Sequence, residues 1–419
     1  MIDVESLAKK AKIASRKLAL CTTDEKNRAL ELIAECVQLN RDAILTANEE
    51  DVAEARKNGL SDALIDRLLL TSERLTANIN DLLRVIELPD PVGEVIEEGV
   101  LPNGLAFQKQ RVPLGVLAVI YEARPNVTLD VASLALKSGN AVVLRGGSET
   151  IRTNSAMARA MREGLKKSTL PYEAVQMITE TDRGLVLKLL QLDTWIDMVI
   201  PRGGATLHAF CKQNSRIPVI TGGIGICHLF VDESADLQAS IEVIRNAKVQ
   251  RPSVCNALDT VLVHEGIAEP FLIDLVNRLK EDGVSFRADE KAYSILGNLG
   301  ADVRIAGTDD FDTEWLSLVL GLRVVKNMDE AIEHIYLHST GHSDGILSNN
   351  SQNTTRFIQE VDSAVVYVNA STRFTDGAQL GLGAEVAVST QRLHARGPMA
   401  LRELTTYKWV VRGNYHIRK

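Results

Sequence analysis

Residues 115–147 read GVLAVIYEARPNVTLDVASLALKSGNAVVLRGG, and this stretch decides the fold class. Residues 116–121 are a short, continuously apolar run, which predicts a buried strand. Residues 126–139 predict a helix closed by Gly139 and Asn140, and residues 141–145 predict a second buried strand. Short apolar strands that alternate with helices form parallel sheets covered on both faces. We therefore expect an α/β fold.

The same alternation extends from this stretch toward the C-terminus. It predicts a loop at 146–149, helices at 150–167, at 185–192 and after Gly204, and strands at 174–179 and 198–200. A second α/β series is expected from about Cys227 to Val368, with strands at 260–264, 322–326, 345–348 and 364–369. A chain of 419 residues is too long for one ordinary core, so two domains or more are expected.

The residues before this stretch predict helices and then a hairpin. Thr22 and Glu25 have the spacing of a capping box, and further helices are expected at 42–56 and 73–85. Two strand-like runs follow around Pro102-Asn103-Gly104, and Asn-Gly is a favoured hairpin turn because both residues accept a positive φ. A lone hairpin is unstable in water. The last residues are also strand-like, so we expect both parts to form a flap that joins subunits.

The composition excludes several classes of function. The chain is 45% hydrophobic and 24% charged, and its low aromatic content of 4% and net charge of -8 argue against nucleic-acid and anionic-membrane partners. Anionic small molecules are not excluded, because helix N-termini can bind them. The acidic Asp3 and Glu5 do not fit a secretory signal, and no run of about 18 apolar residues occurs. Five scattered cysteines without a Cys-x-x-Cys pair indicate neither a disulfide framework nor a zinc site, so we expect a cytoplasmic protein.

Three stretches together resemble the aldehyde dehydrogenase superfamily. PLGVLAVIYEARPN and LALKSGNAVVLRGGSE are similar to its first cofactor-binding strand, helix and second strand. TGGIGICHLFVD is similar to its glycine pair at the entrance to the catalytic domain. Cys255 lies 34 positions beyond Thr221, the spacing that the superfamily uses between its general base and its nucleophilic cysteine.

Within that superfamily the chain most resembles the gamma-glutamyl phosphate reductase branch. VQRPSVCNA and GLGAEVAVSTQRLHARGP are similar to that branch, and nothing is left over for the kinase domain fused to it in some members. The branch signature is matched without a departure by Val325, Ala331, Ile332, His334, Ile335, His338, Ser339, Thr340, His342, Ser343, Asp344 and Ile346.

The resemblance implies an aldehyde-dehydrogenase-like fold and a reaction. It implies a Rossmann-like NADPH-binding domain with N-terminal helices over residues 1–92 and 114–226, and a catalytic domain over 227–370. The oligomerisation flap would comprise 93–113 and 403–419, and 371–402 would be a return segment. The implied activity is the NADPH-dependent reduction of L-glutamyl 5-phosphate to L-glutamate 5-semialdehyde and phosphate in proline biosynthesis. Glutamate 5-kinase is a candidate partner, a homo-oligomer is expected, and no metal is implied.

Cys255 is the implied nucleophile, which would form a thioester that accepts hydride. A thiol of pKa ~8.5 needs nearby positive charge or a helix N-terminus to become a nucleophile, and Arg251 is close in sequence. The other four cysteines are expected to be buried structural thiols in the core. Oxidising relatives carry a glutamate where this chain has Thr221, and threonine is not a useful base at neutral pH. The alternatives are an oxidative or CoA-acylating aldehyde dehydrogenase, or a non-catalytic protein on the same scaffold.

The resemblance implies cofactor-binding residues in three places. They lie at the end of the strand expected at 141–145, after the strand at 198–200 and before the strand at 322–326. Arg145 leaves charge for a 2′-phosphate, with room beside Gly146, Gly147 and Ser148, although such a turn is often bare. Gly203 and Gly204 resemble the pyrophosphate-facing turn, where a helix N-terminus stabilises the phosphates. Glu314 matches the glutamate that binds the nicotinamide ribose, against the alternative of a solvated surface acid.

Four further polar residues have two interpretations each. Asn126 is a candidate oxyanion donor, and it is equally a candidate helix cap. His334, His338 and His342 recur every four residues, which would place them on one face of a helix and suggest a metal site. The Ser-Thr-Gly interruption predicts that the helix ends after Ser339, so we favour polar support of the active site over metal ligation.

Overall fold

The computed structural model describes residues 3–222, 224–297 and 299–418 and divides the chain into two compact units. The first unit contains the chain up to Thr221, residues 381–387 and the chain from Met399 onward. The second unit contains Gly222–Leu380 and Val388–Pro398. The segment 371–402 is therefore shared by the two units, and it carries the short paired strands β14 (Ala387–Ser389) and β15 (Gly397–Met399). No helix in the described part of the chain is long and apolar enough to cross a membrane.

The first unit is built on a four-stranded parallel sheet. Its order is β5 (Val175–Met177), β4 (Ala141–Arg145), β3 (Val116–Tyr121) and β6 (Met198–Arg202). Every residue of β3 is buried, as its apolar run predicted. The chain runs from β3 through β4 to β5 in one direction, and β6 then returns to the other side of β3. The order therefore reverses between β3 and β6, where open α/β sheets bind ligands beyond the carboxyl ends of their strands.

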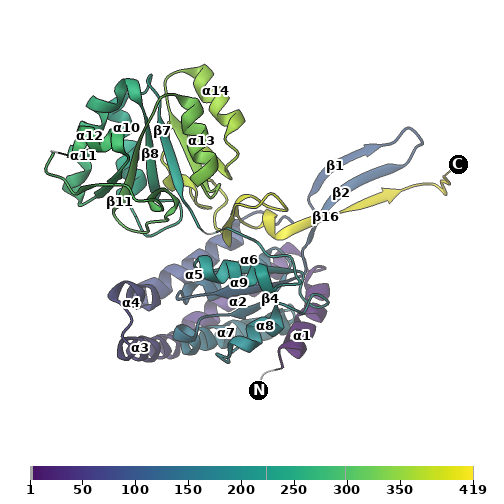
Figure 1. The fold of residues 1–419 in the computed structure, drawn as a ribbon. Helices are drawn as coiled ribbons and strands as arrows, with labels where there is room; N and C mark the ends of the chain where they lie inside the picture. Colours follow the sequence, from purple (N-terminus) through teal and green to yellow (C-terminus); the bar gives the residue numbers. More distant parts are fainter. Residues whose placement is uncertain (1–2, 223, 298, 419) are drawn as a thin grey trace. The chain divides into compact units, whose positions relative to one another are not determined.

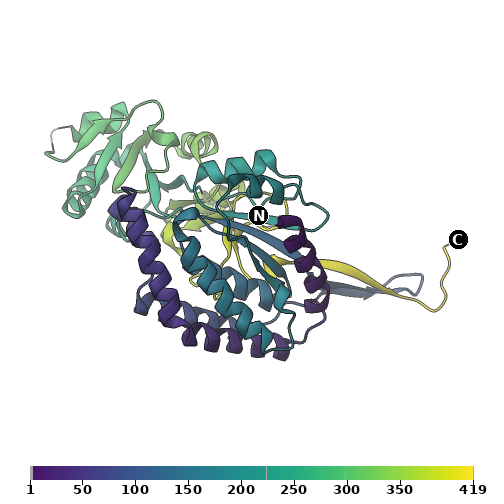
Figure 2. The same cartoon turned by 90° about the horizontal axis from the view of Figure 1, so that it is seen from below.

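Helices cover this sheet in two layers. In the inner layer, α6 and α7 pack on the strands (Figures 1 and 2). In the outer layer, α2, α3 and α5 pack on α6 and α7. The predicted capping box is present, because the Thr22 hydroxyl accepts the Glu25 N–H and the Glu25 carboxylate accepts the Thr22 N–H at 2.8 Å. The helices of the first unit are α1 (Val4–Leu18), α2 (Thr23–Leu39), α3 (Arg41–Lys57), α4 (Asp62–Leu68), α5 (Ser72–Glu87), α6 (Asn126–Lys137), α7 (Ile151–Lys166), α8 (Arg183–Leu189) and α9 (Ala205–Asn214).

The flap is a three-stranded antiparallel sheet of β1 (Val95–Val100), β2 (Ala106–Pro113) and β16 (Thr405–Arg412). The predicted hairpin turn is present, but only Gly104 has a positive φ, of 87°. Asn103 does not adopt one. The turn is closed by the Gly104 N–H, which donates to Leu101 O at 2.8 Å, and the Asn103 side chain accepts the Leu105 N–H at 3.2 Å. A three-residue loop of this kind needs one left-handed residue, which is usually glycine.

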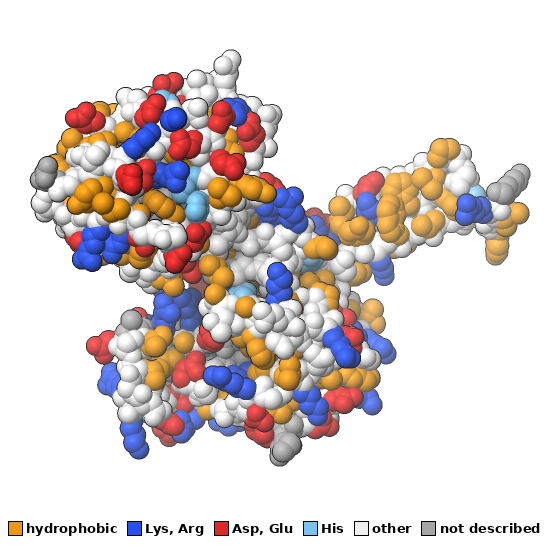
Figure 3. All heavy atoms as spheres, in the orientation of Figure 1, with side chains coloured by type: hydrophobic (Ala, Val, Ile, Leu, Met, Phe, Trp, Pro, Cys, Tyr) orange, Lys and Arg blue, Asp and Glu red, His pale blue; other side chains and the backbone are white. Residues whose placement is uncertain are grey.

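One face of the flap is apolar and exposed. Tyr407, Trp409 and Val411 alternate along β16 and are each more than half exposed. Trp409 packs on Phe107 with ring centroids 5.4 Å apart, and the Lys109 ammonium lies 4.6 Å from the Trp409 ring centroid. Hydrophobic side chains are gathered along the whole flap in Figure 3. An apolar patch of this kind on a polar protein marks an interaction surface.

The second unit is a seven-stranded parallel sheet whose two faces have separate cores. In β7, Leu229 and Val231 pack in one core with α10, α11 and α12, and Phe230 packs in the other with α13 and α14. This alternation of successive side chains explains why the strands are apolar throughout. In spatial order the strands are β10 (Val303–Ile305), β9 (Ser285–Ala288), β11 (Val319–Val325), β8 (Leu258–His264), β7 (Cys227–Val231), β12 (Ser343–Leu347) and β13 (Val365–Val368), and the helices are α10 (Leu237–Val249), α11 (Ala268–Leu279), α12 (Glu290–Leu296), α13 (Met328–His338) and α14 (Ser351–Glu360).

Candidate active site

Cys255 lies in the loop that joins α10 to β8, and its side chain is half-buried. The next residue, Asn256, is buried and anchors the loop. Its amide Nδ2 donates to Thr375 O at 2.8 Å, and its carbonyl accepts the Thr372 hydroxyl at 2.7 Å. The position of the cysteine is therefore set by a segment more than a hundred residues away, which follows β13.

Cys255 and Glu314, which the sequence proposed separately, meet at Gly225. An added Cβ on Gly225 would lie only 1.5 Å from the carbonyl oxygen of Cys255, so only glycine fits there. The Gly225 N–H donates to Glu314 Oε1 at 2.9 Å, and the Cys227 thiol donates to Cys255 O at 3.3 Å. Burial is the main cause that raises the pKa of Glu314. Of the glycine pair noted in the sequence, Gly223 lies outside the described residues.

Residues of the branch signature hydrogen-bond to the backbone segment around Gly225, which contacts the Cys255 loop. The Thr340 hydroxyl accepts the Ile226 N–H at 3.0 Å and donates to Ile224 O at 2.9 Å, so it holds both neighbours of Gly225. Farther along the same segment, Asp344 Oδ1 accepts the His228 N–H at 2.8 Å. The signature residues therefore fix the backbone that touches the cysteine loop.

The three signature histidines do not share one face. Helix α13 ends at His338 with Ser339 as its C-cap, close to the predicted end, so His342 lies beyond the helix. Burial lowers the pKa of His334 to about 2 and that of His342 to about 4, so both are neutral at pH 7. The His334 ring packs against Phe311, with centroids 5.2 Å apart. Within the described ranges, no group of three or more His, Cys, Asp or Glu side chains is arranged to hold a metal ion.

Arg373 is a charged neighbour of Cys255 that the sequence did not indicate. Its Nε donates to Gln250 Oε1 at 3.1 Å, and its Nη1 contacts Asn256 Oδ1. The pKa of Arg373 is lowered mainly by burial and also by Arg251, whereas the charge of Cys255 raises it. No sequence pattern links residue 373 to the cysteine loop, because only the tertiary fold brings them together.

The implied 2′-phosphate residue, Arg145, lies at the end of β4. Its Nη1 donates to Gly146 O at 2.7 Å and its Nη2 to Thr181 O at 3.1 Å. Its Nε is buried and has no partner within the described residues. Burial is the largest cause that lowers the pKa of Arg145, and the charge of Arg183 adds to it. Neither arginine forms an ion pair with any side chain that the structure describes, although the charge of Glu149 opposes the lowering of the Arg145 pKa. Two cations without an ion-pair partner among the described residues therefore lie near the ends of β4 and β5.

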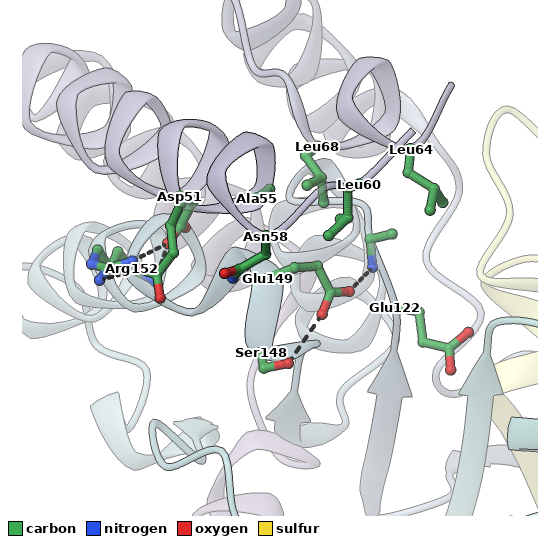
Figure 4. A pocket seen from close by; sticks show the side chains of 12 residues that line it. Asp51, Ala55, Asn58, Leu60, Leu64, Leu68, Glu122, Ser148, Glu149 and Arg152 are labelled. Carbon is green, nitrogen blue, oxygen red and sulfur yellow. Dashed lines mark hydrogen bonds and ion pairs between the residues drawn. The ribbon is translucent and has the colours of Figure 1, made fainter. Parts of the chain in front are cut away.

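A cavity of about 470 Å³ opens beside this edge at the ends of β3 and β4 (Figure 4). Of the predicted cofactor residues it contains only Ser148, and the neighbouring Glu149 accepts the Ala123 N–H at 2.8 Å. Its polar lining is mostly acidic, which disfavours phosphates. The lining consists of Asp51, Glu54, Ala55, Asn58, Leu60, Leu64, Leu68, Glu122, Ala123, Ser148, Glu149 and Arg152.

Gly203 and Gly204 lie at the topological switch point, after β6. Gly204 is the N-cap of α9, and its N–H donates to Glu122 Oε2 at 3.1 Å. A carboxylate therefore occupies the N-terminal end of this helix, where the helix dipole favours negative charge.

Asn126 does not cap α6. It is the first residue of that helix, the N-cap position is occupied by Pro125, and no side chain caps the helix. The helix-cap interpretation was wrong, because the Asn126 amide Nδ2 donates forward to Asp130 Oδ2 at 3.0 Å. Loss of hydration is the main cause that raises the pKa of Asp130 to about 7. Perturbed pKa values cluster at functional sites, and the sequence did not indicate this residue.

A model of the aldehyde dehydrogenase family matches residues 2–293 of the chain. The chain belongs to the aldehyde dehydrogenase family. The gamma-glutamyl phosphate reductase of Photobacterium profundum is 56% identical over 417 residues, which cover 100% of both sequences. The solved structure of the Thermotoga maritima gamma-glutamyl phosphate reductase is 50% identical, covers 100% of both chains and has a TM-score of 0.97. An engineered glycolyl-CoA reductase with bound NADP+ is 16% identical, with 97% and 96% of the two chains covered and a TM-score of 0.67.

Membership of this aldehyde dehydrogenase family confirms the expected fold class and makes the protein an oxidoreductase of a family that uses nicotinamide cofactors. The full-length match to reductases favours the predicted activity over the oxidative, CoA-acylating and non-catalytic alternatives. The roles of individual residues stay predictions. Asn126, Arg145 and Gly204 belong to the first unit, and Cys255 and Glu314 to the second.

Proposed function

We propose that the enzyme reduces L-glutamyl 5-phosphate with NADPH to L-glutamate 5-semialdehyde and phosphate, a step of proline biosynthesis, through a thioester on Cys255. The observation that carries this proposal is the full-length match to gamma-glutamyl phosphate reductases, at 56% identity over 417 residues. The joined arrangement of Cys255, Gly225 and Glu314 supports it. A cytoplasmic location is supported by the lack of any disulfide among the described cysteines.

In the proposed chemistry the Cys255 thiolate attacks the acyl carbon, and the bond from that carbon to the phosphate oxygen breaks. The thioester keeps the acyl group, and the thiol's proton accounts for the one on the departing hydrogen phosphate. When bound, the reduced nicotinamide would supply a hydride to the thioester carbon. The carbon–sulfur bond then breaks, which releases the aldehyde and returns Cys255 to its thiolate form. Glu314 would bind the nicotinamide ribose, with its carboxylate oriented by the Gly225 N–H.

Asn126 is the proposed side-chain donor to the oxyanion that forms at the acyl carbon. An amide group has two N–H donors. Only one is required for the bond from Asn126 to Asp130, so the other is available to substrate.

The reverse reaction tests the proposed function. Glutamate 5-semialdehyde should reduce NADP+ only when inorganic phosphate is present, because phosphate must release the acyl group from Cys255. A requirement for coenzyme A in place of phosphate would favour the CoA-acylating alternative. Reduction that needs only water would favour the oxidative one.

The described residues fit a phosphorylated dinucleotide along the carboxyl edge of the first unit's sheet. The 2′-phosphate would bind at Arg145, whose buried Nε lacks a partner among the described residues, and the nearby Arg183 adds charge. The pyrophosphate would bind at Gly203 and Gly204 and replace the Glu122 carboxylate at the N-terminus of α9. The acidic cavity beside this edge would not hold either phosphate group.

NADPH should therefore be preferred over NADH, and Arg145→Ala should reduce that preference by about ten- to a hundredfold. A charge-assisted contact to phosphate contributes roughly 1.5–3 kcal/mol, which corresponds to this factor. The measurement is kcat/KM for both cofactors in the wild type and the variant. Arg159→Ala on the exposed face of α7 is the matched control. Equal efficiency with both cofactors in the wild type, or an unchanged ratio in Arg145→Ala, would contradict this assignment.

The flap is the proposed oligomerisation surface, because its exposed apolar face needs a partner in water. Deleting residues 408–419, which removes most of β16, should yield monomers in sedimentation velocity. The double substitution Trp409→Glu and Val411→Glu should have the same effect without shortening the strand, since buried carboxylates without partners are costly. Lys408→Gln on the opposite face of β16 serves as the control. Truncated protein that still sediments as the full oligomer would refute the role of the flap.

Glutamate 5-kinase is the proposed source of the substrate. An acyl phosphate is reactive toward water, so an enzyme that forms it is expected to act close to the one that consumes it. No surface of the described residues is assigned to that contact.

A further inference from the structure

The Arg373 guanidinium is attached to the cysteine loop through two neutral amides. Its Nε donates to Gln250 Oε1 at 3.1 Å, five residues before Cys255 in the sequence. Its Nη1 contacts Oδ1 of Asn256, which follows Cys255 directly. The two contacts place the cation beside the loop at positions on either side of the nucleophile.

This attachment is rigid because the two segments bond to each other in both directions. The carbonyl of Asn256 accepts the Thr372 hydroxyl at 2.7 Å, and the Asn256 amide donates to Thr375 O at 2.8 Å. Thr372, Thr375 and Asn256 are all buried. Arg373 therefore keeps its place relative to Cys255 as long as the loop is folded.

The positive charge of Arg373 is not neutralised by its neighbours. It forms no ion pair with a carboxylate in the described part of the chain. The charge of Asp376 raises the pKa of Arg373, but the Asp376 Oδ1 already accepts the Ala378 and Gln379 N–H groups at 2.9 and 3.1 Å. Arg251 adds a second positive charge. Two cations and few competing anions near a nucleophile form a site for an anionic group.

We infer that Arg373, assisted by Arg251, binds the phosphoryl group of the acyl phosphate beside Cys255. This inference rests on the proposed function. The phosphoryl group is bonded through one oxygen to the carbon that the thiolate attacks, whereas the α-carboxylate is separated from that carbon by three others. A cation held against the cysteine loop is therefore expected to lie closer to the phosphate than to the α-carboxylate. The guanidinium fork also matches the phosphate oxygens.

The Arg373 cation would stabilise both the attacking thiolate and the departing phosphate of the first chemical step. Before attack, the negative charge is on the Cys255 sulfur, and Arg373 favours the thiolate over the thiol. As the carbon–sulfur bond forms and the carbon–oxygen bond breaks, the electron pair of the broken bond leaves with the phosphate. Arg373 then lies beside the phosphate group that receives the charge. The cation therefore stabilises the transition state more than it stabilises the neutral thiol.

The test uses inorganic phosphate as the probe in the reverse reaction. In Arg373→Gln, whose amide can keep a hydrogen bond to Gln250 but carries no charge, KM for phosphate should rise about ten- to a hundredfold. KM for glutamate 5-semialdehyde should change little. Arg373→Lys should recover part of the loss, because it restores charge without the fork. The pH at which iodoacetamide alkylates Cys255 half-maximally should move upward in Arg373→Gln, a shift that a merely structural role would not produce.

Arg304→Gln, an exposed substitution on β10 of the same unit, is the control for loss of an arginine, and circular dichroism checks folding. A rise in KM for the aldehyde alone would assign Arg373 to the α-carboxylate and overturn the inference. Unchanged KM for phosphate together with an unchanged alkylation profile would also overturn it. A wild-type enzyme that reduces NADP+ without phosphate would refute the proposed function itself, and this inference with it.

Discussion

Cys255→Ala should abolish turnover and leave cofactor binding nearly intact. The proposed thioester has no other nucleophile at the matching position, and removal of a covalent nucleophile costs on the order of 10⁶-fold in kcat. The backbone of the loop should persist in the variant, because the bonds from Asn256 to Thr375 and from Thr372 to Asn256 do not use the Cys255 side chain. The measurements are the phosphate-dependent rate and a fluorescence titration with NADPH.

Cys21→Ala provides the matched control, since Cys21 lies in the first unit just after α1 and is partly exposed, so that the core position expected for it was wrong. It should retain the wild-type rate. If Cys255→Ala kept more than a few per cent of that rate while Cys21→Ala behaved normally, the thioester mechanism would be wrong. Loss of cofactor binding in Cys255→Ala would instead show that the thiol supports the fold of the site.

Thr221→Glu should convert a stable thioester into one that hydrolyses. Without reduced cofactor, the acyl group on Cys255 of the wild type should decay slowly, because Thr221 cannot activate water. A glutamate at this position should act as a general base and speed deacylation by roughly 10²–10⁴-fold. The acyl-enzyme can be formed with glutamyl phosphate made in situ by a glutamate 5-kinase and ATP, and its decay followed by intact-protein mass spectrometry.

Thr221→Gln has nearly the shape of the glutamate variant and no basic oxygen of comparable strength, so it should deacylate like the wild type. A Thr221→Glu protein that folds and shows no faster decay would leave the role of this position unsupported. Rapid deacylation of the wild type would mean that another residue supplies the base. The inference drawn from the threonine would then fail.

The sequence was informative wherever the structure depends on neighbours along the chain. The apolar runs at β3, β4 and β8 predicted buried parallel strands, since residues covered on both faces must be apolar at every position. The capping box at Thr22 was predicted because its two hydrogen bonds join residues three apart. The short strand β10 was missed, because its residues are half-solvated at the edge of the sheet and form no apolar run.

Family resemblance identified Cys255 and Glu314 as separate candidates, and only the fold joins them through Gly225. The same holds for Thr340, which stood in a recognised signature without a visible role until its hydroxyl was found between Ile224 and Ile226. For Asn126 the local rule for a helix cap failed, because the helix begins at the asparagine and its amide turns to Asp130.

The sequence by itself therefore determined the α/β class, most of the strands in their order along the chain and the capping box at Thr22, while the family resemblance named the candidate nucleophile. The tertiary structure alone decided what surrounds that nucleophile, including the position of Arg373 against Gln250 and Asn256. The physical reason is that periodicity and capping reflect interactions between residues a few positions apart. The contact of Arg373 with the Cys255 loop joins segments more than a hundred residues apart, which become neighbours only when the parallel sheet has formed.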